Sequence, residues 1–68
     1  MMKTYQIVDT NISHFKGIKM PFNFQDYQIG DWIDLFGSQV QVTQKGDTVV
    51  AMASKTQIFV FQELVETD

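Results

Sequence analysis

The sequence that decides the fold is QVQVTQKGDTVVAMASKTQIFVFQELV, residues 39–65. Three runs rich in β-branched and aromatic side chains lie within it, at residues 39–43, 48–53 and 56–65. Two short polar breaks, Gln-Lys-Gly-Asp and Ser-Lys, separate these runs. Strand-forming runs that are joined by such short breaks indicate β-hairpins. The sequence therefore predicts a three-stranded antiparallel meander.

The first polar break contains Gly46. Two-residue hairpin turns require positive φ, and glycine adopts positive φ without a steric cost. We therefore expect Gly46 to have positive φ. Its replacement by valine should then destabilise the hairpin by about 1 kcal/mol or more.

The chain before residue 25 is less regular. A first strand is predicted at residues 4–9, and the Asp, Thr and Asn side chains that follow favour a turn. The next segment, SHFKGIKMPFNF at residues 13–24, contains Gly17 and Pro21, which interrupt any helix. Proline is tolerated only at a sheet edge or in extended chain. We expect an irregular strand or a long extended loop that packs its aromatic side chains on the meander.

Residues 25–37, QDYQIGDWIDLFG, fit two structures. Four apolar residues have helical spacing: Ile29, Trp32, Ile33 and Phe36. A short helix at residues 26–36 would place Gly30 in its interior, at a cost of about 1 kcal/mol. In the alternative, Gly30 and Asp31 form a turn before a strand at residues 32–36. That strand has Ile33 and Leu35 on one face and Trp32, Asp34 and Phe36 on the other. We favour the strand.

Five or six short strands with frequent turns predict an all-β fold, a small antiparallel barrel or rolled sheet. Residues 1–66 would form its single domain and residues 67–68 a frayed tail. The turn Gly-Asp-Trp-Ile at residues 30–33, followed by tight hairpins, resembles those of SH3-like and similar small barrels. The resemblance implies a style of fold and brings no family's activity or binding residues with it.

The composition limits what can stabilise a domain of 68 residues. The chain has no cysteine and one histidine, His14, so disulfides and a zinc site of the usual kind are excluded. We expect no cofactor and no metal. Oligomerisation, for example as a homodimer, is the remaining way to reinforce a small core.

The sequence also bears on location. Its N-terminus has no apolar stretch typical of a signal peptide. Its longest apolar runs, such as residues 49–53, fall far short of the roughly 20 residues that span a bilayer. A chain without cysteine is compatible with a reducing compartment. We expect a cytoplasmic protein that does not bind membranes.

No spacing assembles a catalytic site. His14 is the only imidazole base, and its neighbour Ser13 would point to the opposite face of an extended chain. The carboxylates at residues 26, 31 and 34 do not have the spacing of a calcium loop. The glycines are scattered and do not form a phosphate-binding loop. We therefore expect no enzymatic activity and assign no catalytic residue.

The charge is unevenly distributed. Residues 1–24 carry three lysines and one aspartate, whereas residues 25–68 carry two lysines and seven carboxylates, for a net charge of −3. The basic part also contains aromatic rings, a combination that small barrels use to bind nucleic acid. The candidate contacts are His14, Phe15, Lys16 and Lys19. The acidic pI near 4.7 argues against nucleic-acid binding, which we keep as the alternative.

The favoured hypothesis is a non-enzymatic protein-interaction module that associates with itself or with another protein. Nine aromatic residues and four methionines are more apolar bulk than a small barrel easily buries. Aromatic side chains and methionine are enriched at interface centres. The candidate interface residues are Met20, Phe22, Phe24, Trp32 and Phe36. Small acidic β proteins without cysteine also suit accessory or structural roles in bacteria and their phages.

Overall fold

The computed structural model describes residues 3–64. It contains six strands: β1 (Lys3–Thr10), β2 (Lys19–Phe22), β3 (Trp32–Leu35), β4 (Ser38–Lys45), β5 (Val49–Ala53) and β6 (Ile58–Glu63). Two single turns of 3₁₀-helix, η1 (Ser13–Phe15) and η2 (Phe24–Asp26), lie in the connections that flank β2. The predicted tail at residues 67–68 lies outside the described residues.

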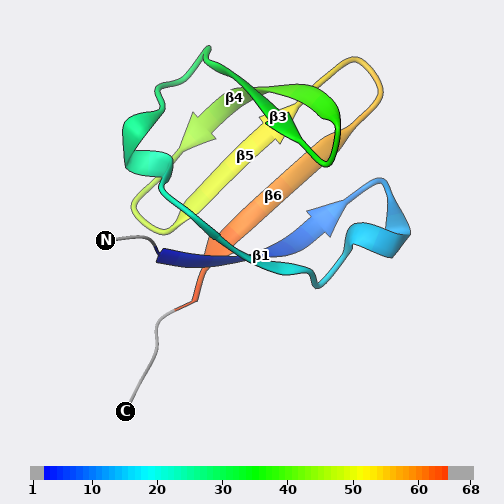
Figure 1. The fold of residues 1–68 in the computed structure, drawn as a ribbon, viewed down its shortest axis with the longest axis horizontal. Helices are drawn as coiled ribbons and strands as arrows, with labels where there is room; N and C mark the ends of the chain where they lie inside the picture. The colour runs from blue at the N-terminus through cyan, green and yellow to red at the C-terminus, as the bar shows by residue number, and fades with distance from the viewer. Residues whose placement is uncertain (1–2, 65–68) are drawn as a thin grey trace.

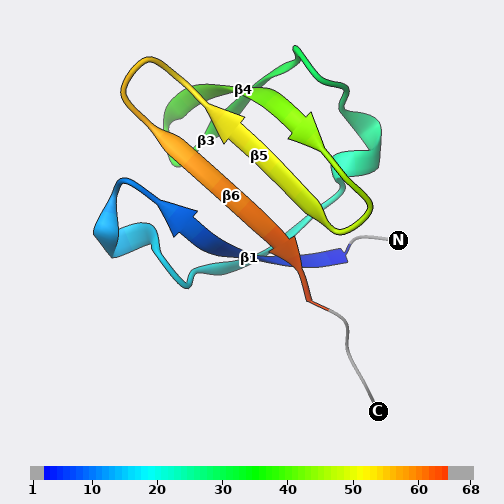
Figure 2. The ribbon, with the colours of Figure 1, turned by 180° about the vertical axis from the view of Figure 1, so that it is seen from behind.

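All strands pair antiparallel in one sheet of order β2-β1-β6-β5-β4-β3, which curls into a half-barrel (Figures 1 and 2). The meander from β3 to β6 pairs each strand with the next, and β1 then adds to β6. The strands β2 and β3 are therefore the two edges of the sheet. The all-β fold and the meander are confirmed, whereas an SH3-like arrangement is not.

The ambiguity before β4 is settled in favour of the strand. Gly30 has a φ of 101° and lies in a turn, and β3 follows from Trp32. Burial alternates along β3 as expected, because Ile33 and Leu35 are buried and Trp32 and Asp34 are exposed. The alternative helix at residues 26–36 is wrong. The predicted strand is also one residue too long, since Phe36 belongs to the turn.

The expectation of positive φ at Gly46 is wrong. Within residues 3–64, positive φ occurs at Gly17, Gly30, Phe36 and Gly37. The strand β4 continues to Lys45 through a bulge, so three residues connect it to β5 and not the four of the predicted break. This connection closes with a hydrogen bond from the Gly46 N–H to the Val49 carbonyl, 2.8 Å, and none of its residues has positive φ.

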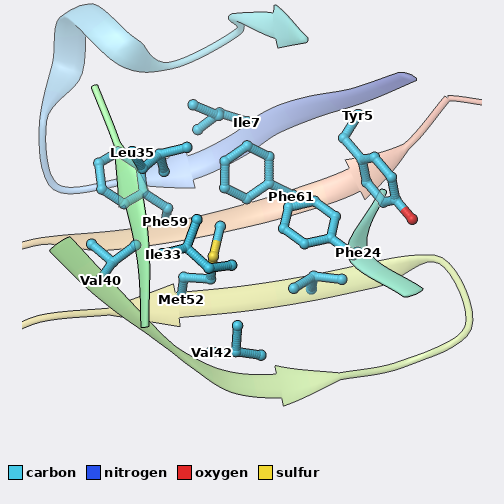
Figure 3. Packing of buried hydrophobic residues seen from close by; sticks show 11 residues of the cluster. Tyr5, Ile7, Phe24, Ile33, Leu35, Val40, Val42, Met52, Phe59 and Phe61 are labelled. Atoms are coloured by element: carbon cyan, nitrogen blue, oxygen red, sulfur yellow. The ribbon is translucent and has the colours of Figure 1, made fainter. Parts of the chain in front are cut away.

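The core lies on the concave face of the sheet (Figure 3). Alternate side chains of β1, β3, β4, β5 and β6 point inward, as the period of a strand requires. The buried residues are Tyr5, Ile7, Phe24, Ile33, Leu35, Val40, Val42, Val50, Met52, Phe59 and Phe61. Each large apolar side chain that is fully enclosed contributes about 1.5–3 kcal/mol to stability.

Aromatic side chains from the two 3₁₀ turns reach opposite ends of the phenylalanine pair on β6. Phe24 of η2 lies 5.4 Å from Phe61, measured between ring centroids, and Phe15 of η1 lies 6.0 Å from Phe59. The two rings on β6 are themselves 6.4 Å apart. The irregular connections around β2 therefore supply an aromatic residue to each end of the core, which explains why the segment at residues 13–24 is rich in phenylalanine.

Candidate functional site

The predicted interface residues do not form one surface. Trp32 on β3 and Phe36 in the following turn are 58% and 44% exposed. Met20 and Phe22 are half-buried on β2, at the other edge of the sheet. Only Trp32 combines high exposure with a position in an edge strand.

Phe24 is a core residue, so its assignment to the interface is wrong. Its side chain is 2% exposed. The chain leaves the extended conformation after Phe22 and enters η2, which turns Phe24 inward. Its ring then meets Tyr5 edge-on at 4.7 Å and stacks on Phe22 at 4.3 Å, both between ring centroids. The spacing of two between Met20, Phe22 and Phe24 predicts that all three share one face of a strand. The structure differs because η2 turns the Phe24 side chain into the core.

The outward face of β4, β5 and β6 contains no charged side chain. Its residues are Gln39, Gln41, Thr43, Gln44, Val49, Ala51, Ala53, Ile58, Val60 and Gln62. Strand pairing aligns Trp32, Gln41, Ala53 and Ile58 in one row across four strands. Strands that are apolar on both faces are typical of sheets covered on both sides. Here β5 and β6 have that composition, and Ile58 is 51% exposed.

The edge strand β3 has free backbone groups. Val42 donates its N–H to the Asp31 carbonyl at 2.9 Å, so residue 31 is directed toward β4. Alternation along an antiparallel strand then directs Ile33 and Leu35 toward β4 as well. The N–H and C=O groups of Trp32 and Asp34 point away from the sheet. Within residues 3–64 they have no backbone partner.

The edge strand β2 is blunted by proline, as expected for proline in a sheet. Ile7 donates its N–H to the Ile18 carbonyl at 2.9 Å, so alternate residues from Ile18 are directed toward β1. Lys19 and Pro21 therefore point their backbone groups outward. Because proline has no N–H, this edge offers one donor, from Lys19, and two carbonyl acceptors.

The two edges carry opposite charge. Lys19 is exposed on β2, and Asp34 is exposed on β3 with Asp31 just before it. In the described part of the chain, the one ion pair joins Lys3 and Glu63, with 3.1 Å between Nζ and Oε1. The Asp34 Oδ1 atom accepts a hydrogen bond from the Gly37 N–H at 3.1 Å. Lys19 and Asp34 are thus charges that no described residue neutralises.

The candidate nucleic-acid contacts are gathered around η1, where His14, Lys16 and Lys19 are exposed. Phe15, the aromatic residue among them, is half-buried. Its ring stacks on Phe36 with centroids 4.6 Å apart and planes at 17°, and it meets His14 at 4.3 Å. The side chains of Phe36 and His14 therefore already cover the Phe15 ring, which would have to stack on a base.

Two of the serine side chains have structural contacts. Ser54 accepts hydrogen bonds from the N–H groups of Thr56 and Gln57, and Ser38 accepts one from the Gln57 amide. Within residues 3–64, no hydrogen bond joins His14 to a serine or a carboxylate. No group of three metal-ligating side chains occurs among these residues either. The same part of the chain contains no helix with the length and hydrophobicity needed to cross a membrane.

One titratable group in the core has a shifted pKa. Burial raises the pKa of the Tyr5 hydroxyl above its usual 10.0. The negative charge of Glu63 raises the pKa further, and Lys3 opposes the increase. These three residues lie where β1 meets β6, so the shift belongs to the packing of the sheet.

Comparison with protein-family models, curated proteins and solved structures finds no match for this chain.

Proposed function

We propose that the protein is a non-enzymatic interaction module that associates with a second copy of itself. The observation that carries this proposal is Trp32, which is 58% exposed on an edge strand with free backbone groups. Apolar surface that stays in water costs about 25 cal/mol for each Å². Tryptophan is also among the residues most enriched at the centres of protein interfaces.

The rest of the molecule supports association. The row from Trp32 to Ile58 crosses the outward face of β4, β5 and β6, where no charged side chain repels a second copy. A domain of this size buries only about 60% of its unfolded surface and has a small margin of stability. The chain has no cysteine to form a disulfide. Burial of this surface in an oligomer would stabilise the fold further.

Nucleic-acid binding has weaker support. The chain has a net charge of −3, and the ring of Phe15 is already stacked on Phe36. Retention on a polyanionic column separates the two proposals. Retention that falls as salt rises, and that is lost on replacement of both Lys16 and Lys19 by glutamine, would favour nucleic acid.

Light scattering over a concentration series tests self-association. The apparent mass of the wild type should rise from that of a 7.9 kDa monomer as concentration increases. The variant Trp32→Ser should associate about tenfold more weakly, since a buried tryptophan at an interface contributes upward of 1 kcal/mol. Ile29→Ser is the matched control, because Ile29 is 65% exposed but lies beside the β4–β5 turn. A monomer at every concentration would contradict the proposal.

A further inference from the structure

We infer that the two free edges of the half-barrel pair with each other between copies. In this arrangement β3 of one copy lies antiparallel to β2 of a second copy. Asp34 is then opposite Lys19 of the second copy, and Trp32 is opposite Pro21. The inference rests on the proposed self-association and adds the contact through which it occurs.

The backbone groups of the two edges are complementary in this register. Asp34 and Lys19 both direct their N–H and C=O groups outward, so they can exchange two hydrogen bonds. The Trp32 N–H can donate a third bond to the Pro21 carbonyl. Only the Trp32 carbonyl is left without a donor, because Pro21 has no N–H. If β2 paired with β2 of a second copy, each of the two Pro21 residues would leave one carbonyl without a donor.

The side chains agree with the same register. Trp32 and Asp34 are exposed and Ile33 between them is buried. On β2, Lys19 and Pro21 are exposed and Met20 between them is half-buried against the core. Opposed residues of neighbouring strands share a face, so Ile33 meets Met20 on the inner side. A slip by one residue would turn a charged side chain inward.

The charges of the edges favour pairing of β3 with β2 over pairing of β3 with β3. The β3 edge has Asp34 with Asp31 before it, and the β2 edge has Lys19. Opposite charges placed directly across two strands stabilise the pairing, and like charges destabilise it. Pairing β3 with β3 of the second copy would bring the aspartates of both chains together. Pairing β3 with β2 instead neutralises Asp34 with Lys19 and avoids that repulsion.

The surroundings of Pro21 suit Trp32. Pro21 lines an open hollow beside β2, whose other lining residues are Met20, Phe22, Asn23, Asp26 and Tyr27. The exposed indole would cover the ring of Pro21, which is on the same face, instead of facing water. When both edges of one copy pair with the same second copy, a closed dimer results. When they pair with different copies, the assembly is a head-to-tail chain. Both forms use the same contacts.

Charge exchange tests the pairing of Asp34 with Lys19. Each of Asp34→Lys and Lys19→Asp should weaken association, measured by light scattering, about tenfold, because each places like charges opposite one another. An equimolar mixture of the two variants should recover the wild-type mass, since every interface between unlike variants again pairs opposite charges. Asp47→Lys and Lys55→Asp are the controls. They change the net charge equally but lie in exposed turns away from both edges.

Cysteine trapping tests the register without a charge reversal. The wild type has no cysteine, so Asp34→Cys and Lys19→Cys each introduce a single thiol. Cα atoms of a hydrogen-bonded antiparallel pair are about 5.5 Å apart, within the range of a disulfide. Oxidation of the mixed variants should give a disulfide-linked pair that contains one copy of each. The control is Lys55→Cys mixed with Asp34→Cys, which should give no such disulfide-linked pair.

The outcomes separate this inference from the proposed function. The inference is overturned if the mixed charge variants fail to recover association, or if Asp34→Cys links no better to Lys19→Cys than to Lys55→Cys. If Ile58→Asp abolishes association and the edge variants do not, the outward face joins the copies. That result also overturns the inference and leaves the proposed function standing. A wild-type monomer at every concentration overturns both.

Discussion

Phe15 and Phe36 stack with ring centroids 4.6 Å apart and ring planes at 17°, although they lie in different connections of the sheet. Phe36 adopts a φ of 55° in the two-residue turn between β3 and β4, and Gly37 beside it has a φ of 82°. A bulky side chain with positive φ is strained, at a cost of about 1–2 kcal/mol. The stack with Phe15 offsets this strain and joins the β3–β4 turn to η1.

The variant Phe36→Asn should therefore change the free energy of unfolding by less than about 1 kcal/mol. Asparagine tolerates positive φ, and Asn-Gly is the favoured type I′ pair, so the relieved strain compensates for the lost stack. The variant Phe15→Ala loses the same stack without this relief and should be destabilised by about 2 kcal/mol, below the cost for a fully buried phenylalanine. Urea unfolding measures both. Equal losses would show that Phe36 is not strained.

Glycine substitutions separate the turns that need positive φ from the one that does not. Gly37→Ala should destabilise the protein by about 1 kcal/mol or more, since alanine is strained at a φ of 82°. Gly46→Ala should change stability by less than about 0.5 kcal/mol, because its added methyl group meets only the Val49 carbonyl, at 3.4 Å. Thermal unfolding compares them. The reverse order would contradict the assigned turns.

Asn11 connects the loop after β1 to the β5–β6 turn. Its amide donates to the Thr56 carbonyl at 2.8 Å, and its Oδ1 accepts from the Ile58 N–H at 2.9 Å. Loss of both bonds in Asn11→Ala should destabilise the protein by about 1–2 kcal/mol. Thr56→Ala, which keeps its backbone carbonyl, is the control. Hydrogen exchange should show faster exchange of the Ile58 amide in Asn11→Ala alone, and unchanged exchange would argue against the bridge.

Tyr5 makes stability depend on pH in the alkaline range. Burial raises the pKa of the Tyr5 hydroxyl above 10.0, the value expected for the unfolded chain. The unfolded chain therefore loses this proton first, and stability decreases as pH rises through the window above 10. Melting temperatures between pH 9 and 12, on the scale of a tyrosine titration, should fall less steeply for Tyr5→Phe than for the wild type. Parallel curves would contradict the shift.

Local patterns in the sequence account for much of the fold. The alternation of Ile33 and Leu35 with polar or aromatic neighbours favoured a strand over a helix, because a helix would have placed Gly30 in its interior, and the structure has the strand. Pro21 limited its segment to a sheet edge or an extended loop because proline has no N–H, and the structure has the edge strand β2 there. Both features depend on residues that are close in the chain.

Features that depend on distant residues were not predictable. Phe24 continued the spacing of Met20 and Phe22, and only its contacts with Tyr5 and Phe61 reveal that η2 buries it. The pairing of β1 with β6 joins the two ends of the chain, which no local pattern specifies. Trp32, a candidate interface residue from the sequence, is exposed. That Lys19 lies on the opposite edge of the sheet emerged only with the strand order.

Amide hydrogen exchange at several protein concentrations tests the edge pairing most directly. The N–H groups of Trp32, Asp34 and Lys19 point outward from the edges and have no described backbone partner in one copy. Pairing between copies should protect these three amides progressively as concentration rises, because each then donates to a neighbouring strand. The amides of Asp47 and Lys55, in exposed turns, should exchange equally fast throughout. Fast exchange of the edge amides at every concentration would contradict the pairing of the two edges.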